Sequence, residues 1–411
     1  MLGNRRFVTL AAVLALVAAV PAVSAAVAAP ADPRTRQALF VGNNWDGTVD
    51  VLSPDAGLER IRRIDVVPDL DQRLREIYTN PVRLLYFLGI RLAIGEGHDQ
   101  LVDDMYTTAD GRTLVVSRPS LADVVAIDLA GGGLKWRFPV EGQRSDHMAI
   151  SPDGQHVAVS ASTANLVHIL DVHTGQEVGR FPSGDSPHEN VYSRDGSRIF
   201  HASIGHVYTP LDGNWADSTK GARYFQVVDS TTNEVVRRLD MGAELRAAGY
   251  PDMSSAVRPM TFSADERFVY FQVSFFHGFI EYDLERDRVT RVASLPIPEE
   301  AQDIPREQYP LDSAHHGIAM NPQGTELCVA GTVSDYATIV SQETFRNKGL
   351  VRSGTKPYWA TPSSDGQYCF VSWSGTDSVS AVSYQTGAEA GSAAVGDHPQ
   401  RMRLGRIALP G

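Results

Sequence analysis

Histidine, carboxylate and arginine side chains recur at the start of a segment that is repeated along the chain. The first position of this segment is occupied in turn by Asp103, Asp146, His188, Arg258, His316, Tyr358 and Gln400. The second position is occupied by Asp104, His147, Glu189, Pro259, Gly317, Trp359 and Arg401. Imidazoles and carboxylates bind transition metals, and a histidine beside a carboxylate can transfer protons near neutral pH. If the fold brings these positions together, they form one composite site rather than a local motif.

The repeated segment is a short strand followed by a turn of the Asp-Gly type. Two clear copies are DHMAISPDG, which ends at Gly154, and HENVYSRDG, which ends at Gly196. An Asp-Gly pair between apolar runs predicts a β-hairpin. The turn residues Asp110, Asp153 and Asp195 lie 43 and 42 residues apart. A period of about 40 to 45 residues with four strands in each unit is typical of the blades of a β-propeller.

Six such units are complete, and a seventh is divided between the two ends of the chain. Gly396–Gly405 match the start of an innermost strand, and Ala38–Leu52 match the second and third strands of a blade. We therefore predict an all-β fold for residues 29–411, a seven-bladed β-propeller of four-stranded blades. The N- and C-terminal strands are expected to close the last blade, which removes exposed sheet edges.

Insertions lengthen the connections between strands, at residues 69–97, 207–224, 242–257 and 299–314. Three of them precede an innermost strand and the other joins a second strand to a third, so all are expected on one face, called the insertion face below. The innermost strands line the central channel and begin at this face. Because repeat proteins concentrate binding residues among such loops, we predict that a small molecule binds at this mouth of the channel. Leu74–Leu92 has helical apolar spacing interrupted by Pro81 and is predicted to pack on the propeller.

One interpretation of the recurring positions is a metal site. The proposed ligands are His147, His188 and His316 with Asp104 or Glu189, and the ion would be copper, zinc or iron. Propellers that hold a metal on the axis with histidines offer an analogy for this arrangement. The sequence has no local ligand spacing such as His-Glu-x-x-His, so the site depends on the fold.

Two further interpretations need no metal. In the first, His188, Glu189 and Arg258, together with His316, carry out acid–base chemistry on an anionic substrate. Further contacts with a small-molecule ligand are expected from Tyr358, Trp359, Arg401 and His98. In the second, the polar residues are structural and the loops of a non-catalytic scaffold bind a protein or a cell-wall ligand. The sequence leaves these interpretations open.

Two short segments resemble those of a known family. Residues 43–51, which read NNWDGTVDV, and the turn Ser151-Pro-Asp-Gly are similar to segments of the YVTN or YncE-like seven-bladed propellers. The resemblance covers nearly all of the chain after residue 28 and implies the same fold. It implies little about activity, because the family contains both enzymes and binding proteins. Some related propellers are lactonases or lactonising cycloisomerases, which implies acid–base roles for His188, Glu189, Arg258 and His316.

The N-terminus has the features of an export signal. Arg5 and Arg6 precede an apolar run over residues 7–20, and small residues follow up to Ala28. We therefore predict that residues 1–28 are a signal peptide and that the mature protein is secreted or extracytoplasmic. No run has the ~20 apolar residues of a membrane-spanning helix. A net charge of −12 argues against nucleic acid as a partner, whereas a protein partner is compatible with it.

The two cysteines, Cys328 and Cys369, are predicted to lie on equivalent strands of neighbouring blades. Such strands usually lie too far apart for a disulfide, which favours a Cα separation of about 5.5 Å. An oxidising compartment permits pairing, but the spacing favours two buried thiols. No disulfide framework is expected to hold this fold together.

Overall fold

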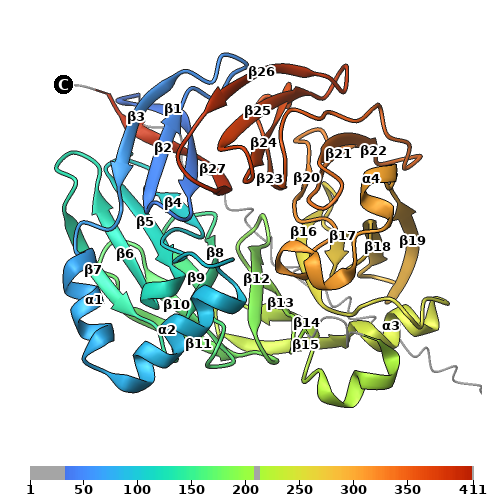
Figure 1. Cartoon of the computed structure of the whole chain (residues 1–411), viewed down its shortest axis with the longest axis horizontal. Helices are drawn as coiled ribbons and strands as arrows, with labels where there is room; N and C mark the ends of the chain where they lie inside the picture. Colours follow the sequence, from blue (N-terminus) through green and yellow to red (C-terminus); the bar gives the residue numbers. More distant parts are fainter. Residues whose placement is uncertain (1–32, 208–212, 410–411) are drawn as a thin grey trace, which may run out of the picture.

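The strands form a ring of sheets around a central axis (Figure 1). The computed structural model describes residues 33–207 and 213–409, and within them seven antiparallel sheets are arranged as the blades of a propeller. The predicted all-β, seven-bladed fold is therefore confirmed. The predicted signal peptide, residues 1–28, lies outside the described residues.

The blades share one order of strands from the axis outward. The innermost strands are β4 (Met105–Thr107), β8 (Ser145–Ile150), β12 (Pro187–Tyr192), β16 (Val257–Phe262), β20 (Ile318–Met320), β23 (Pro357–Pro362) and β27 (Pro399–Ala408). The second strands are β5 (Thr113–Arg118), β9 (His156–Ala161), β13 (Arg198–Ser203), β17 (Phe268–Val273), β21 (Glu326–Gly331), β24 (Tyr368–Trp373) and β1 (Thr35–Asn43).

The two outer positions follow the same order. The third strands are β6 (Asp123–Asp128), β10 (Leu166–Asp171), β14 (Tyr224–Asp229), β18 (Gly278–Asp283), β22 (Tyr336–Ser341), β25 (Ser378–Ser383) and β2 (Thr48–Leu52). The outermost strands are β7 (Leu134–Pro139), β11 (Glu177–Pro182), β15 (Glu234–Asp240), β19 (Arg288–Ser294), β26 (Glu389–Ala394) and β3 (Arg60–Asp65). In the blade of β20, residues 346–351 follow β22 and pair with it only through two isolated bridges, at Asn347 and Val351.

The two ends of the chain close the ring. β27 is hydrogen-bonded to β1 in a sheet with the order β27-β1-β2-β3. The register runs from Thr35 opposite Ala408 to Val41 opposite Met402. The closure of the last blade by N- and C-terminal strands, predicted from the sequence, is confirmed.

Local turn chemistry fixes the hairpins nearest the axis. The Asp153 carboxylate accepts hydrogen bonds from the Gln155 amide (3.0 Å) and the Ser151 hydroxyl (2.5 Å). Gly154 follows with φ of +71°, a left-handed conformation in which glycine carries no steric penalty. The same Ser–Asp hydrogen bond occurs at Ser193–Asp195, Ser263–Asp265 and Ser363–Asp365. Each innermost strand of this kind is thereby tied to its second strand.

Buried apolar residues fill the spaces between neighbouring blades. One cluster joins Val49 and Val51 of β2 to Leu114 and Val116 of β5 in the next blade. Both faces of the second strands are covered in this way, and nearly all of their side chains are buried. The packing between blades holds the starts of the innermost strands in place around the axis.

Helices occur in the insertions and connections. They are α1 (Leu70–Tyr78), α2 (Pro81–Ala93), α3 (Met241–Ala247), α4 (Glu299–Gln302) and the 3-10 turns η1 (Pro119–Leu121), η2 (Asn214–Thr219), η3 (Arg306–Gln308) and η4 (Pro310–Asp312). Asn80 caps α2 by accepting a hydrogen bond from the Arg83 amide (3.1 Å). Phe87 of α2 packs against Leu101 and Leu121 beside the propeller. Within the described ranges, no helix combines the length and apolarity needed to cross a membrane.

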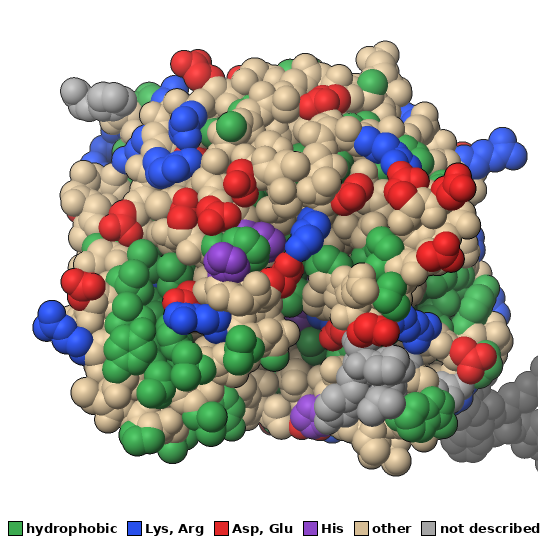
Figure 2. Space-filling model, in the orientation of Figure 1, with side chains coloured by type: hydrophobic (Ala, Val, Ile, Leu, Met, Phe, Trp, Pro, Cys, Tyr) green, Lys and Arg blue, Asp and Glu red, His purple; other side chains and the backbone are tan. Residues whose placement is uncertain are grey.

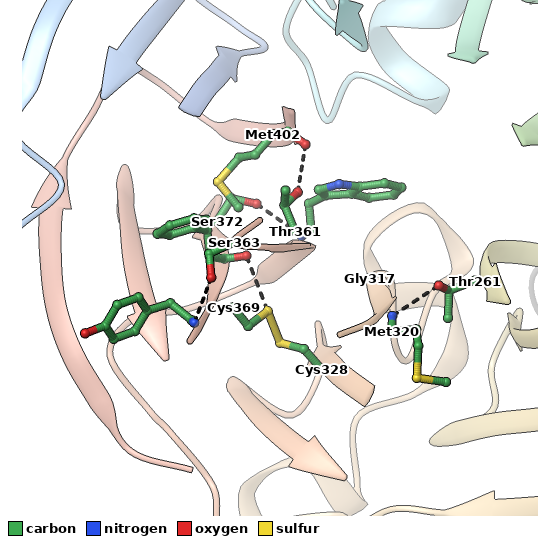
Figure 3. Close-up of a disulfide and its surroundings, with 12 residues drawn as sticks. Thr261, Gly317, Met320, Cys328, Thr361, Ser363, Cys369, Ser372 and Met402 are labelled. Carbon is green, nitrogen blue, oxygen red and sulfur yellow. Dashed lines mark hydrogen bonds between the residues drawn. A yellow bond between two sulfur atoms is a disulfide. The ribbon is translucent and has the colours of Figure 1, made fainter. Parts of the chain in front are cut away.

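Cys328 of β21 and Cys369 of β24 form a disulfide between neighbouring blades (Figure 3). The prediction of two free thiols is therefore wrong. The two strands pack face to face within one apolar cluster, and the Cα atoms of the cysteines lie 6.4 Å apart. This separation is within the range that a disulfide spans, so inter-blade packing at this point is closer than the sequence register suggested.

Candidate functional site

Residues from different blades meet on the axis at the start of the innermost strands. The ring centroids of His147 (β8) and His188 (β12) are 3.8 Å apart, and the ring of His316, just before β20, lies 6.3 Å and 6.1 Å from them. Nδ1 of His147 is hydrogen-bonded to Oε2 of Glu189 at 2.8 Å. All of these side chains are buried. We call the following set the axial cluster: Asp103, Asp146, His147, His188, Glu189, His316 and Arg401.

Irregular strand pairing aims these side chains at the axis. The register between β8 and β9 shifts between Ser145 and Met148, which leaves the residues at 146 and 147 out of the ladder. The register between β12 and β13 shifts between Pro187 and Asn190, which does the same for residues 188 and 189. Comparable shifts occur in β16, β23 and β27. Such bulges redirect side chains and are frequent beside functional sites.

Two further carboxylates border His147. Nε2 of His147 lies 3.3 Å from Oδ1 of Asp146 and 3.9 Å from Oδ2 of Asp103. Arg144 forms an ion pair with the other oxygen of Asp146 at 2.5 Å. The potential ligand atoms of His147, His188 and Glu189 lie within 4.8 Å of one another, as do those of Asp103, Asp146 and His147. His147 is therefore shared by two groups of side chains that have the composition of a metal site.

Arg401 is the central cation of the cluster. Its side chain is fully buried, and its guanidinium carbon lies 3.9 Å from the centre of the Trp359 ring. Its Nη2 contacts both ring nitrogens of His147 and lies 3.5 Å from Oε2 of Glu189. Its Nε and Nη1 have no hydrogen-bond partner among the described residues, and neither has Nε1 of Trp359. The cluster thus presents buried N–H groups, on Nη1 of Arg401 and Nε1 of Trp359, that have no hydrogen-bond acceptor in the described part of the chain.

The remaining predicted residues of the ring adjoin this set. The Tyr358 ring is stacked on His316, with centroids 4.1 Å apart. Nε of Arg258 donates a hydrogen bond to the Ser274 hydroxyl at 2.9 Å, and the charge of Arg258 contributes to lowering the pKa of both His188 and His316. Arg258 therefore lies close enough to act on a ligand at the cluster.

Burial shifts the proton equilibria of the cluster toward neutral forms. Burial raises the pKa of Asp103 and of Glu189 to about 7. Burial, and next the charge of Arg401, hold the pKa of His147 well below its usual range, and burial likewise lowers the pKa of His188 and His316. At neutral pH the three imidazoles are uncharged. The carboxyl groups of Asp103 and Glu189 are present in both protonated and ionised forms at this pH. Groups with pKa values near 7 are suited to general acid–base catalysis.

The structure places two predicted site residues apart from the cluster. Both oxygens of Asp104 accept hydrogen bonds from Arg403 at 2.8 Å, and one also accepts the Met148 amide. Asp104 is thus occupied as an ion-pair partner and does not belong to either metal-like group. His98 is exposed on the loop after α2 and is stacked on Trp45 at a centroid distance of 3.9 Å. The metal-ligand role of Asp104 and the ligand contact of His98 stay predictions.

Sequence reasoning missed the contributions of Arg144 and Arg403. Arg144 stands two residues before Asp146, and Arg403 stands two residues after Arg401 on β27. Alternation along a strand places residues two apart on the same side, so the Arg-Met-Arg sequence was an available signal. Asp103 and Asp146 were recognised as ring positions but not selected as site residues.

A cavity of about 540 Å³ extends from the cluster along the channel, and we call it the channel cavity. Glu189, Trp359 and Arg403 line its inner end, and Arg194 and Pro322 at the hairpin turns line its outer end. It therefore runs toward the face opposite the insertions. On the insertion face, Figure 2 shows a hollow near the centre and apolar side chains gathered over α1 and α2.

Comparisons with known proteins bear on the fold. No family model and no curated protein sequence matches the chain. Among solved structures, the chain is similar to dihydro-heme d1 dehydrogenase NirN in complex with DHE, with a TM-score of 0.52 and 12% sequence identity. The alignment covers 87% of this chain and 63% of that chain, so this chain spans less than two thirds of the length of its neighbour. At this identity the likeness shows the propeller fold alone, and the YVTN-like family assignment stays a prediction.

Proposed function

We propose that this protein binds a small oxyanion at the axial cluster and acts on it by metal-free acid–base chemistry. The observation that carries the proposal is Arg401, a fully buried guanidinium whose Nη1–H groups have no hydrogen-bond acceptor among the described residues and whose Nε lies 3.5 Å from Oδ2 of Asp103. A buried donor without an acceptor costs about 1 to 3 kcal/mol, and more when it is charged. A bound oxyanion would supply the acceptors and the opposite charge.

The charges around Arg401 support an anion rather than a cation. Asp104 is paired with Arg403, and Asp146 is paired with Arg144. Arg401 instead faces Asp103 and Glu189 at 3.5 Å, and burial raises the pKa of both carboxyls to about 7. At pH 7 these two half-ionised carboxyls together carry about one negative charge, which matches the charge of Arg401, and Arg258 adds a second positive charge that acts on His188 and His316. An anionic ligand completes this balance in a site of low dielectric constant.

The side chains suggest a division of roles for proton transfer. Glu189 has a pKa of about 7 and is hydrogen-bonded to the neutral imidazole of His147, which makes it the proposed proton donor and acceptor. Arg401 would orient the substrate and stabilise negative charge that develops on it. Arg258 and Tyr358 would contact the substrate from the side of His316. Proton transfer of this kind is the chemistry implied by the resemblance to lactonases and lactonising cycloisomerases.

A transition metal is the second candidate occupant. Two neutral imidazoles with a carboxylate, His147, His188 and Glu189, form a donor set that zinc, iron or copper accepts. The fit is incomplete, because Nη2 of Arg401 lies against both ring nitrogens of His147. A metal ion would require this guanidinium to move, whereas an oxyanion uses it where it is. The dihydro-heme d1 dehydrogenase NirN supports small-molecule binding by a propeller of similar shape, but at 12% identity it names no cofactor for this chain.

Anion titration tests the proposal. The mature protein, purified without a histidine tag, is titrated with acetate and with phosphate by calorimetry, and its metal content is measured. We expect saturable anion binding that is lost in Arg401→Met and kept in Arg36→Met, which changes an exposed arginine. Metal bound in equimolar amount and lost in His188→Ala would favour the second candidate. Absence of both anion and metal would favour the non-catalytic scaffold.

We also propose that the protein acts outside the cytoplasm. The predicted signal peptide supports this location, and so does the disulfide between Cys328 and Cys369, because disulfides persist mainly in oxidising compartments. Detection of the processed chain in the culture medium or the extracytoplasmic fraction, with a new N-terminus near residue 29, would test it.

A further inference from the structure

The outward side of the helix α2 is apolar. Leu85 and Leu92 are 71% and 78% exposed, although a helix on a protein surface normally turns polar side chains to solvent. Six of the thirteen large apolar residues that are exposed in the described part of the chain fall within residues 78–92. Figure 2 shows apolar side chains gathered over α1 and α2, and a contiguous patch of this kind marks an interaction surface. We call the following set the α2 face: Tyr78, Val82, Leu85, Tyr86, Leu88 and Leu92.

The inner side of α2 already holds the helix on the propeller. Phe87 and Ile90 are buried, and at 3.6 residues per turn they lie on the side opposite Leu85. Arg91 donates two hydrogen bonds to the carboxylate of Asp99, each at 2.7 Å. Rotating α2 to bury its outward side would break these contacts, so the α2 face stays available to a partner.

Arginines border the α2 face on both sides. Residues 77–95 contain Arg83 and Arg91 and no aspartate or glutamate, and helical spacing places these two arginines on either side of the face. Arg83 donates to the main-chain carbonyl of Gln143 at 2.7 Å, an uncharged acceptor that leaves its charge without a direct ion pair. Charges farther apart than about 8 Å are largely screened at physiological ionic strength, so these arginines act on a docked surface more strongly than the net charge of −12. The α2 face therefore fits an anionic partner.

The size of the α2 face decides between a protein and a lipid surface. A specific protein interface uses about 20 to 30 residues on each side, whereas the α2 face comprises six side chains on and beside one helix of 13 residues. An amphipathic helix needs no larger area to lie in a membrane interface, where apolar side chains enter the acyl boundary and basic side chains meet the headgroups. Tyr78 and Tyr86 suit this boundary, because tyrosine is enriched where a bilayer meets water.

We propose that the α2 face docks this protein on an anionic membrane surface, with α2 lying in the plane of the interface. The apolar side chains of the face enter the acyl boundary, while Arg83 and Arg91 lie at the level of the lipid phosphates. The inference concerns a surface formed by the α1–α2 insertion, and it does not rest on the proposed oxyanion site.

The test is co-sedimentation of the mature protein with vesicles of phosphatidylglycerol, which is anionic, and of phosphatidylcholine, which has no net charge. We expect binding to phosphatidylglycerol to be at least about fivefold stronger, the factor contributed by one arginine near an anionic surface. Leu85→Gln and Leu92→Gln should each weaken binding by about tenfold, because most of a leucine side chain leaves water on docking. Val236→Gln and Ile297→Gln change exposed apolar residues outside the hairpin; they are the matched controls and should bind as the unsubstituted chain does.

The remaining outcomes overturn the proposal. Absence of binding to phosphatidylglycerol would refute the membrane surface, and equal binding to both lipids would refute its anionic character. Unchanged binding by both leucine variants would show that the lipid contacts another part of the protein. A dimer in size-exclusion chromatography that the leucine variants do not form would show that a second copy covers the α2 face. If a leucine variant melts below the unsubstituted chain, the comparison of the two lipids with the unsubstituted chain still decides.

Discussion

Replacing Glu189 with glutamine tests the electrostatics of the axial cluster. Burial raises the pKa of Glu189 to about 7, whereas a glutamate in an unfolded chain has a pKa of about 4.3. Between these values the folded protein holds a proton that the unfolded chain has lost, so the free energy of unfolding falls as pH rises through this window and is level above it. At about 1.4 kcal/mol per pH unit, Glu189 accounts for a loss of about 3 kcal/mol between pH 4.5 and 8.

The Glu189→Gln variant lacks this titration. Urea unfolding at pH 4.5 and at pH 8 measures the free energy for the wild type and the variant, and the variant should lose about 3 kcal/mol less across this range. Glu300→Gln is the control: Glu300 is exposed, and its contact with Arg352 lowers its pKa, the direction opposite to that of Glu189, so its replacement should not reduce the loss of stability toward pH 8. Parallel pH profiles for the wild type and Glu189→Gln would refute the raised pKa and, with it, the role of Glu189 near neutral pH.

Further predictions concern the disulfide, the closure of the ring and the metal. Breaking the bond between Cys328 and Cys369, which are 41 residues apart, should lower the free energy of unfolding by about 4 kcal/mol. Urea unfolding with and without reductant measures this difference, and identical unfolding curves would contradict the prediction. Removing residues from Met402 onward deletes most of β27 and exposes β1, so the chain should melt well below the full length; equal melting temperatures would disprove the closure. In equilibrium dialysis against zinc, Arg401→Gln should bind more metal than the wild type, and adding His188→Ala should abolish this gain. Absence of zinc from both proteins would eliminate zinc as the occupant of the cluster.

Several features of the site could not be read from the sequence. Asp104 and His147 occupy the same position of consecutive repeats, yet Asp104 is paired with Arg403, 299 residues away, while His147 faces Glu189. The repeat register gives the height of a residue along the axis but not its partner across the channel. That partner depends on how the bulge in each innermost strand turns the side chain, which is set by packing against the neighbouring blade.

The sequence by itself determined the fold and the ring of candidate residues. The Asp-Gly turns, the period near 42 residues and the matching of Ala38–Leu52 to the end of the chain are local signals, because turn conformation and strand alternation act over a few residues. Only the tertiary structure decided which ring residues face the axial cluster and which, like Asp104, are engaged in an ion pair. The raised pKa of Glu189, the buried donors of Arg401 and the disulfide of Cys328 arise from contacts between blades. Burial and distance between distant segments set these properties, and neither is encoded in the spacing of residues along one repeat.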